Sequence, residues 1–412
     1  MERKKGILLV SLAAAFLVAL ICVAAVFFPQ GGSGGNAYFV EFGLSDDFYV
    51  DGEPISGSER TSLLDEIGAL LKEIEDEVSV EKSGSDIARL NAAQAGEEVS
   101  VGGHTYAMLR LCKNLYEETG GAFTPALYAL SELWGFSPAY EGHYTDSRPE
   151  PGEEEIAAAL AVSDFENIEL RENNVVVKTD GGTKLDLGGI AKGYMSDAAA
   201  ALVRGKYPGQ QLDGILTVMS NSILFGQKRD ESAEGGVRGY TMQIDNPRSL
   251  TTASGRAAVG VNLTDVAVST SADTYRFYVW EDKIYKHILD PHTGKPSDNG
   301  VISVTALVPL TEGAAYAGAF ADALSTAGFC MPLQDALAFY GDMAQKYGVG
   351  AVVITSDFRY YVVGNYGILD PSDYSAGDTD VFTRAEVSEA PARVEPCAEE
   401  RKYIEYVAGL SA

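Results

Sequence analysis

The amino-acid sequence predicts an α+β fold in which helices pack on a largely antiparallel sheet. Between residues 62 and 160, apolar side chains recur at helical spacing. After residue 168, short runs of alternating apolar and polar residues dominate, with helices between them. The 412 residues, of which 46% are hydrophobic and 22% charged, suffice for one large domain or two closely packed ones. No internal repeat is evident.

The first part of the chain is expected to be mainly helical, after a strand at residues 38–50. Six apolar residues within 62–77 fall on one helical face: Leu63, Leu64, Ile67, Leu70, Leu71 and Ile74. Further helices are predicted at 104–118, 122–134 and 153–160. Acidic residues open the last of these, where they suit a helix N-terminus.

Strands are expected to dominate from residue 168 onward. They are predicted at 174–179, 214–225, 240–245, 256–261, 283–288, 301–307, 350–355 and 359–363. A helix is predicted at 318–329. Beyond about residue 370 the chain becomes acidic and loop-like and ends in a short amphipathic stretch at 399–407, a composition that fits either a disordered tail or a segment docked on a partner.

The N-terminus predicts a membrane anchor. Basic residues at positions 3–5 precede an uncharged apolar run at 7–28. Such a run can span a bilayer, which takes about 20 residues, and the basic flank predicts that the globular part lies outside. A cleaved signal peptide and a lipoprotein signal ending at Cys22 are the alternatives. The expected division is an anchor or signal at 1–29, a Gly-rich linker at 30–37, a main domain at 38–370 and an acidic tail at 371–412.

Charge and cysteine usage exclude several classes of site. A formal net charge of -28 argues against nucleic-acid binding, which depends on clustered Lys and Arg. Cys22, Cys112, Cys330 and Cys397 show no metal-ligand spacing, so neither a zinc site nor a disulfide framework is indicated.

The most informative run is KLDLGGIAKGYMSDA at residues 184–198. The pattern predicts a strand, a tight turn at Gly188 and Gly189, and the start of a helix. The first turn of a helix has free N–H groups and the positive dipole end, so a phosphate is expected there with Lys192 to neutralise it. Asp186 is placed to orient a ligand group. A purely geometric role for the glycines is about equally common.

This run resembles the D-L-G-G-I-A-K-G-Y signature of the ApbE family, the FAD:protein FMN transferases. A second run, YKHILDPHTGKP at 285–296, places His287 at a turn, and histidine is a candidate general base because its usual pKa is near physiological pH. It resembles the family motif H-I-L-D-P-x-T-G. The resemblance implies that His287 activates the acceptor hydroxyl and that Leu289 contacts the flavin nucleotide through its backbone.

A third run, GAFADALSTAGF at 318–329, predicts a metal site. Asp322 and Thr326 are four residues apart on one helix face, so a carboxylate and a hydroxyl can both offer hard oxygen ligands to Mg²⁺. The run resembles the family's A-D-A-x-x-T motif. The resemblance implies Asp322, Ser325, Thr326 and the Gly189 carbonyl as the ligands.

Further runs at 267–277, 79–91 and 121–136 resemble family motifs in the same order. By resemblance, the nucleotide-binding positions are Phe42, Glu81, Ala122, Phe123, Thr124, Asp186, Lys192, Thr270, Ser271, Asp273 and Leu289. The chain departs from the family pattern at several of these and neighbouring positions. Glu81 stands where an aromatic residue is common, Thr124 where aspartate is usual, MSNS at 219–222 where L-G-G-N is usual, and FGL at 42–44 where M-G-T is usual.

The resemblance implies an ApbE-like two-lobed domain and a magnesium-dependent transferase. Its substrate is FAD, its product is an acceptor protein carrying FMN on a Thr or Ser hydroxyl, and AMP is released. The predicted topology places the reaction outside the membrane, on anchored or secreted redox proteins. Two alternatives stay open: an FAD pyrophosphatase that uses water, and a non-catalytic flavin-binding module, to which the departures at 124 and 219–222 lend weight.

Overall fold

In the computed structural model, the described residues are 33–37, 40–141, 143, 145–230, 232–249, 251, 257–274, 276–281, 283–311, 315–369 and 381–411. The apolar run predicted as an anchor, residues 7–28, lies outside these ranges. Within them, no helix combines the length and the apolar character needed to cross a membrane.

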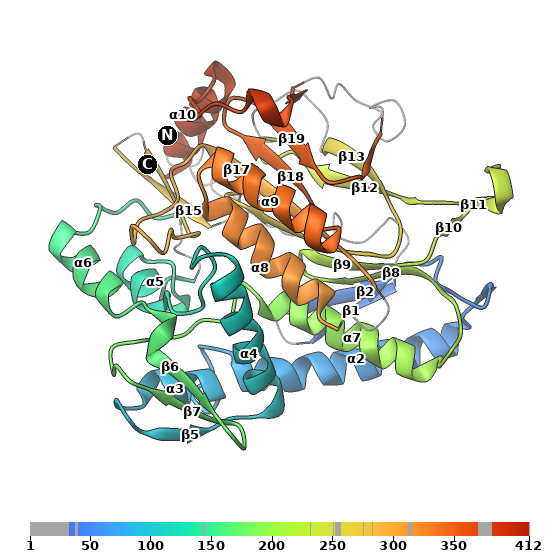
Figure 1. The fold of residues 1–412 in the computed structure, drawn as a ribbon, viewed down its shortest axis with the longest axis horizontal. Coiled ribbons are helices and arrows are strands. Elements are labelled where there is room, and N and C mark those ends of the chain that lie inside the picture. Colours follow the sequence, from blue (N-terminus) through green and yellow to red (C-terminus); the bar gives the residue numbers. More distant parts are fainter. Residues whose placement is uncertain are drawn as a thin grey trace, which may run out of the picture.

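An 11-stranded sheet forms the centre of the molecule (Figure 1). Its main path runs, in spatial order, through β1 (Ser33–Ala37), β2 (Val40–Leu44), β8 (Leu212–Val218), β9 (Asn221–Phe225), β14 (Val266–Ala272), β17 (Val301–Pro309), β18 (Gly350–Thr355), β19 (Arg359–Val363) and β21 (Thr383–Arg384). The short strands β3 (Tyr49–Val50) and β4 (Glu53–Pro54) extend it beside β8. Only β19 and β21 pair in parallel among the described strands. The predicted antiparallel sheet is therefore confirmed.

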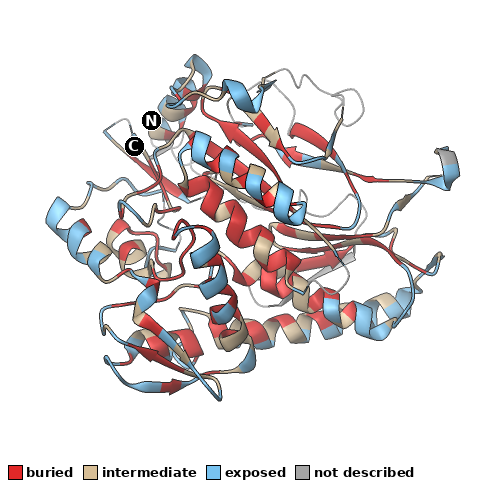
Figure 2. Ribbon diagram, in the orientation of Figure 1, coloured by how far each residue is buried: buried red, intermediate tan, exposed pale blue. Residues whose placement is uncertain are grey.

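Helices cover one face of this sheet. α7 (Ala191–Lys206) lies over β8 and β9, α8 (Ala317–Cys330) lies over β14 and β17, and α9 (Leu333–Tyr347) packs on β18 and β19. α2 (Gly57–Val78) packs against α7 and β2. Figure 2 shows α8 buried along most of its length. Apart from Asp322, Ser325 and Thr326, its residues are apolar and mostly small, which is typical of a helix enclosed by other elements.

A smaller sheet covers the opposite face. It consists of β12 (Tyr240–Asp245), β13 (Ala257–Leu263) and β20 (Gly367–Ile368). Val259 and Val261 of β13 pack with Leu224 and Val266 of the central sheet in a separate apolar cluster. The central sheet is thus buried on both sides, which explains strands such as β18, whose residues are all buried.

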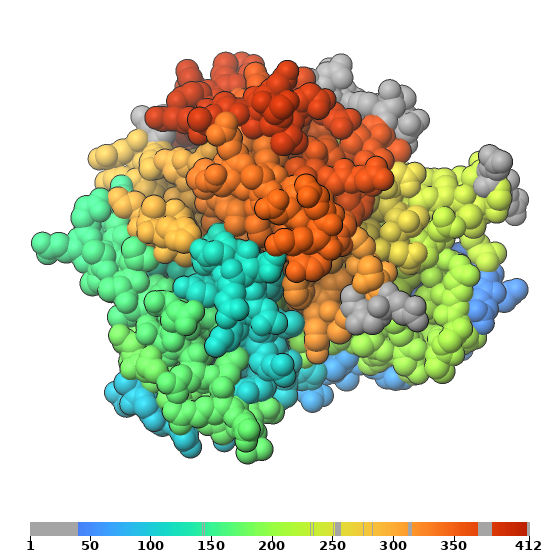
Figure 3. Space-filling view, viewed as in Figure 1, coloured from blue at the N-terminus to red at the C-terminus, as the bar shows by residue number. Residues whose placement is uncertain are grey.

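A second lobe packs beside the helical layer. Its elements are α3 (Asp86–Ala92), β5 (Glu98–Ser100), α4 (Gly103–Glu118), α5 (Tyr128–Trp134), α6 (Glu153–Ala161), β6 (Ile168–Arg171) and β7 (Val175–Lys178). In the space-filling view this teal and green lobe meets the orange segment that contains α8 and α9 (Figure 3). α4 contacts both α2 and α8, so the two lobes share a boundary.

The C-terminal region packs on the domain. β15 (Phe277–Trp280) and β16 (Lys283–Lys286) form a two-stranded sheet, and α10 (Ala398–Ser411) lies against β15. Tyr403 and Val407 of α10 are buried with Phe277 and Val279 of β15. The described part of the predicted acidic tail, residues 381–411, is therefore an ordered part of the fold.

Three boundaries differ from the sequence prediction for identifiable reasons. The predicted strand at 214–225 is a hairpin, β8 and β9, which turns at Met219 with a positive φ of 53°. The predicted strand at 38–50 is divided into β2 and β3 by a turn at 46–47. The predicted helix at 122–134 begins only at Tyr128. Pro125 disfavours helical geometry at Thr124, so a helix through 122–124 is unfavourable.

β14 and α9 are among the elements that were not predicted. β14 lies between β9 and β17 in the sheet. Its second half is polar, and buried and half-buried residues do not alternate along it, so it lacks the usual pattern of a strand. α9 follows α8 after only two residues, and its buried face packs on the sheet edge.

Candidate functional site

The site is organised by the close crossing of α7 and α8. A Cβ atom built on Gly193 would lie 2.1 Å from the carbonyl oxygen of Gly318, so neither glycine tolerates a side chain there. Each helix also supplies a carboxylate to the other. Asp197 of α7 accepts hydrogen bonds from the N–H groups of Gly318 and Ala319, both at 2.8 Å. Burial is the main reason that the pKa of Asp197 is raised to about 7.

Asp322 of α8 completes this exchange and lies at the centre of the candidate site. Its Oδ2 accepts the Gly193 N–H at 3.0 Å, and its Oδ1 accepts the Ser269 hydroxyl at 3.2 Å. Lys192 Nζ lies 3.3 Å from Oδ1. The carboxylate is buried, so these contacts compensate its lost hydration and hold its orientation.

A cluster of hydroxyl groups lies one turn further along α8. Ser271 Oγ is 2.8 Å from Ser325 Oγ and 3.2 Å from Thr326 Oγ1. Both α8 hydroxyls donate to the carbonyl oxygen of Asp322, at 2.9 and 3.2 Å. Since each hydroxyl has one proton, Ser271 is the donor in its contact with these groups, and each α8 hydroxyl keeps at least one lone pair for a ligand.

The turn before α7 lies against this cluster. A Cβ built on Gly189 would be 3.7 Å from Thr326 Oγ1 and 3.3 Å from a ring carbon of Phe123. The side-chain groups gathered beside this turn are the Asp322 carboxylate and the hydroxyls of Ser271, Ser325 and Thr326, all of them oxygen ligands. Such a set fits a hard cation such as Mg²⁺ and suits a soft metal poorly.

The turn partly departs from the expected phosphate site. The N–H of Ala191 bonds to Leu187 O at 2.8 Å, and the N–H of Gly193 bonds to Asp322. Two N–H groups of the first helical turn thus have protein partners. Asp186 accepts the N–H of Gly188 at 2.8 Å and so shapes the turn itself. Lys192 donates to Gly188 O at 2.6 Å, and its side chain remains about one third exposed.

His287 lies immediately after β16. Its Nδ1 lies 3.1 Å from Arg276 O, and its backbone N–H donates to the same carbonyl at 3.0 Å. Because a carbonyl only accepts, Nδ1 carries the proton and Nε2 has the free lone pair. Burial, reinforced by the charges of Arg276 and Lys192, lowers the pKa of His287 to about 4. The imidazole is therefore neutral at physiological pH.

Three other predicted residues have different surroundings. Thr270 points to the other face of β14 from Ser269 and Ser271, and its hydroxyl lies 2.8 Å from that of Thr305. Asp273 is buried and forms ion pairs with Arg248 and Lys286. The Leu289 carbonyl accepts the Cys330 thiol at 3.4 Å.

The upstream positions divide into two groups. Ala122, Phe123 and Thr124 are buried in the segment before α5, and Phe123 contacts the Gly189 turn as described above. Phe42 is buried against Gly68 of α2 in the main core, whereas Glu81 is exposed beyond the end of that helix. Of these two groups, the first lies beside the Asp322 cluster, because Phe123 contacts the turn at Gly189.

Asn221 lies beside the site but was not predicted as a site residue. The sequence analysis noted it only within the run MSNS at 219–222, which differs from the family pattern. It is fully buried, and neither its amide oxygen nor its amide nitrogen has a hydrogen-bond partner. It pairs directly with Ser269 across the sheet, so both side chains lie on the same face. Ser269 in turn bonds to Asp322. An orphaned amide beside the cluster is a signal that only the folded structure provides.

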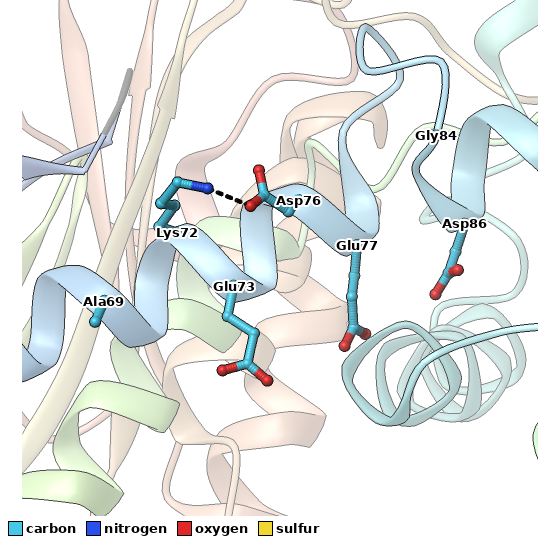
Figure 4. Close-up of a pocket in the computed structure, with 7 residues that line it drawn as sticks. All are labelled: Ala69, Lys72, Glu73, Asp76, Glu77, Gly84 and Asp86. Atoms are coloured by element: carbon cyan, nitrogen blue, oxygen red, sulfur yellow. Dashed lines mark hydrogen bonds and ion pairs between the residues drawn. The ribbon is translucent and has the colours of Figure 1, made fainter.

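A separate acidic hollow lies along α2 (Figure 4). Its lining residues are Ala69, Lys72, Glu73, Asp76, Glu77, Gly84 and Asp86. Lys72 pairs with Asp76, and Glu77 accepts the N–H groups of His104 and Thr105 at 3.1 and 3.2 Å. Glu77 thus caps α4. None of the predicted site residues lines this hollow.

Comparison with known proteins identifies the relatives of this fold and site. The model of the ApbE family matches residues 46–352. The FAD:protein FMN transferase of Treponema pallidum is 29% identical over 324 residues, which cover 76% of this chain and 82% of that protein. The FAD:protein FMN transferase of Vibrio cholerae is 31% identical over 254 residues, covering 61% and 70% respectively.

Solved structures give the same picture of the fold. The ApbE protein of Thermotoga maritima superposes with a TM-score of 0.64 at 26% identity, covering 83% of this chain and 97% of that one. The flavin transferase ApbE of Vibrio cholerae superposes with a TM-score of 0.62 at 23% identity, covering 82% and 96%.

Proposed function

This chain belongs to the ApbE family, and from that membership we propose that it is a transferase that moves the FMN half of FAD onto a Ser or Thr hydroxyl of an acceptor protein. The observation that carries the proposal is the buried carboxylate of Asp322, which lies 3.3 Å from Lys192 Nζ and one turn from the hydroxyls of Ser325 and Thr326. Together with the neutral imidazole of His287, these groups supply the charge stabilisation and the base that phosphoryl transfer to a hydroxyl requires.

The proposed reaction is a direct transfer of the FMN phosphoryl group from FAD to the acceptor hydroxyl. The acceptor hydroxyl oxygen attacks the phosphorus on the FMN side of the pyrophosphate, a new P–O bond forms, and the bridging P–O bond breaks to release AMP. The hydroxyl proton passes to Nε2 of His287, the nitrogen that the Arg276 contact leaves unprotonated. Lys192 offsets the negative charge of the phosphates.

The proposal includes Mg²⁺, held by Asp322, Ser325, Thr326 and the Gly189 carbonyl. The all-oxygen donor set supports this choice, because Mg²⁺ prefers carboxylate, hydroxyl and carbonyl ligands. When bound, such an ion neutralises phosphate charge and acts as a Lewis acid. In a chain with a net charge of -28, local neutralisation of an anionic substrate is essential.

The proposed location is the outer face of the cell membrane, with the apolar run at 7–28 as the anchor and its basic flank inside. Acceptors would then be membrane-anchored or secreted redox proteins. Labelling of a cysteine introduced into the 31–35 linker with a membrane-impermeant reagent on intact cells tests this topology. Labelling only after lysis would contradict it.

The decisive test of the activity is mass gain by an acceptor. The detergent-solubilised full chain is incubated with FAD, Mg²⁺ and a flavin-carrying redox subunit, and the acceptor is weighed. An added FMN phosphoryl group that requires both enzyme and Mg²⁺ supports the proposal. Free FMN and AMP without any acceptor modification would instead identify a pyrophosphatase, and FAD binding without turnover would identify a binding module.

A further inference from the structure

Four charged side chains form a buried cluster behind the site. Arg248 is fully buried, and Asp273, Glu400 and Lys286 are 1%, 4% and 8% exposed. Arg248 Nη1 and Nη2 donate to the two oxygens of Asp273 at 2.7 and 2.9 Å. Its Nε and Nη2 donate to the two oxygens of Glu400 at 2.6 and 2.8 Å. Lys286 Nζ lies 3.2 Å from Asp273.

Of these four groups, two are positive and two are negative. Removing one partner of a buried ion pair is far more damaging than replacing the pair with apolar residues, because it leaves an uncompensated charge. Glu400 is the only carboxylate among these four that comes from the C-terminal helix α10. Among these four groups, removing its charge would leave Asp273 with both Arg248 and Lys286.

The cluster is joined to the site through the backbone. Asp273 follows Ser271, the hydroxyl bonded to Ser325, by two residues, and Lys286 directly precedes His287. Lys286 also donates to Val301 O at 3.1 Å, which ties β16 to the central sheet. Any shift of Asp273 or Lys286 therefore moves a hydroxyl or the base.

α10 also covers β15 and β16 directly. Tyr403 and Val407 are buried against Phe277 and Val279, and the guanidinium carbon of Arg248 lies 4.3 Å above the Tyr403 ring. The family model ends at residue 352, so α10 lies outside the part of the chain that it matches.

We propose that Glu400 is a positioning residue, which neutralises the buried cluster and thereby holds Ser271 and His287 in their working geometry. The consequence for catalysis rests on the proposed transferase function. The consequence for local structure does not, and this difference separates the two in an experiment.

The test compares the full-length variants Glu400→Gln and Glu399→Gln. Both substitutions remove one negative charge from α10. Glu399, however, is exposed and forms a surface ion pair, with 3.9 Å between its Oε1 and Lys402 Nζ. Amide hydrogen exchange in the 276–289 region is measured first, without substrate. We expect faster exchange in E400Q, including at the His287 N–H, and no change in E399Q.

Steady-state transfer is measured next. We expect E400Q to lower kcat by roughly 10-fold to 100-fold, with the KM for FAD little changed. This is the range for residues that hold site residues in place without touching the substrate. The double variant Arg248→Met with Glu400→Leu, which removes one charge of each sign, should recover kcat to within a few fold. If E400Q does not fold, Glu400→Asp tests the same geometry with the charge retained, and we expect a smaller loss of kcat.

Two results would overturn the proposal. One is exchange and kcat in E400Q equal to those of E399Q. The other is a uniform rise in exchange throughout the domain without rescue by the double variant, which would indicate a general stabilising role. If the wild-type chain shows no FMN transfer, the proposed function fails, while the exchange data still decide whether Glu400 holds this region.

Discussion

The carboxylate of Asp322 accepts a hydrogen bond from the backbone N–H of Gly193 at 3.0 Å, across 129 positions of the sequence. Asp197 returns the contact by capping the first turn of α8. The N-terminal end of each helix is therefore held by hydrogen bonds from its backbone N–H groups to a carboxylate of the other helix. Because Lys192 directly precedes Gly193, the same contact holds the backbone from which the Lys192 ammonium group reaches Asp322.

Gly193→Ala tests this crossing. The new methyl group would lie 2.1 Å from Gly318 O, so we expect a loss of stability of about 1–3 kcal/mol or more, measured by urea unfolding. Gly205→Ala is the matched control in the same helix, because a Cβ there meets nothing within 4 Å. Replacing a helical glycine by alanine should stabilise by about 0.5–1 kcal/mol. Equal effects of the two substitutions would contradict the close packing.

Asp322→Asn keeps the side-chain shape but removes the charge. We expect the Mg²⁺-dependent kcat/KM to fall by roughly 10²-fold or more, on the scale of losing one contact that stabilises the transition state. Circular dichroism should be unchanged, because an amide oxygen still accepts the Gly193 N–H. Wild-type activity in this variant would remove Asp322 from the proposed metal site.

His287→Gln tests the base. Loss of general-base catalysis should lower kcat by about 10²-fold to 10⁴-fold. FAD affinity, measured by equilibrium titration, should change less than twofold, because the imidazole acts on the acceptor and not on FAD. A large loss of FAD binding would show that His287 holds the nucleotide instead.

The low pKa of His287 predicts an unusual pH profile. With a pKa near 4 instead of the ordinary 6.5, the base stays unprotonated as the pH falls through 6.5. We expect kcat/KM for FAD to remain level from pH 8 to about pH 5 and to decline only as the pH approaches about 4. An acid limb centred near pH 6.5 would mean that burial and the charge of Lys192 do not act on this side chain.

The same shift affects stability. Between about pH 4 and pH 6.5 the unfolded chain binds a proton at His287 that the folded chain does not, so this residue makes folding more favourable as the pH rises through that window. In His287→Gln, unfolding measured across the window should show a weaker rise with pH. An unchanged pH slope would argue against a shifted pKa in the native state.

Asn221→Leu separates stability from ligand binding. Because the buried amide has no partner, its replacement should stabilise the ligand-free protein by about 1–3 kcal/mol, and the rise in melting temperature on adding FAD and Mg²⁺ should shrink. Ser222→Ala is the control on the opposite face of β9, where the Ser222 hydroxyl lies 3.2 Å from that of Thr217. It should leave the ligand response unchanged. A full response in the leucine variant would mean that bound ligands do not meet Asn221.

Local patterns accounted for much of the fold. The apolar face of residues 62–77 predicted the core of α2, because helical periodicity is written in neighbouring residues. The strand at 240–245 and the strand at 350–355 match their predictions residue for residue. The prediction at 122–134 shows the limit of this reasoning: the observed helix begins only at Tyr128, after Pro125, although the apolar pattern starts at Ala122.

By itself, the sequence determined the residue types of the site and the turn at Gly188 and Gly189, because motifs and turn chemistry are local. Tertiary structure alone decided which of them meet: Asp322 with Gly193, Ser271 with Ser325, and Glu400 with a buried arginine. Charged residues of an acidic tail are usually solvated, so nothing in the linear pattern marks Glu400 as buried. The cost of burying a charge is met only by partners that folding brings from distant parts of the chain.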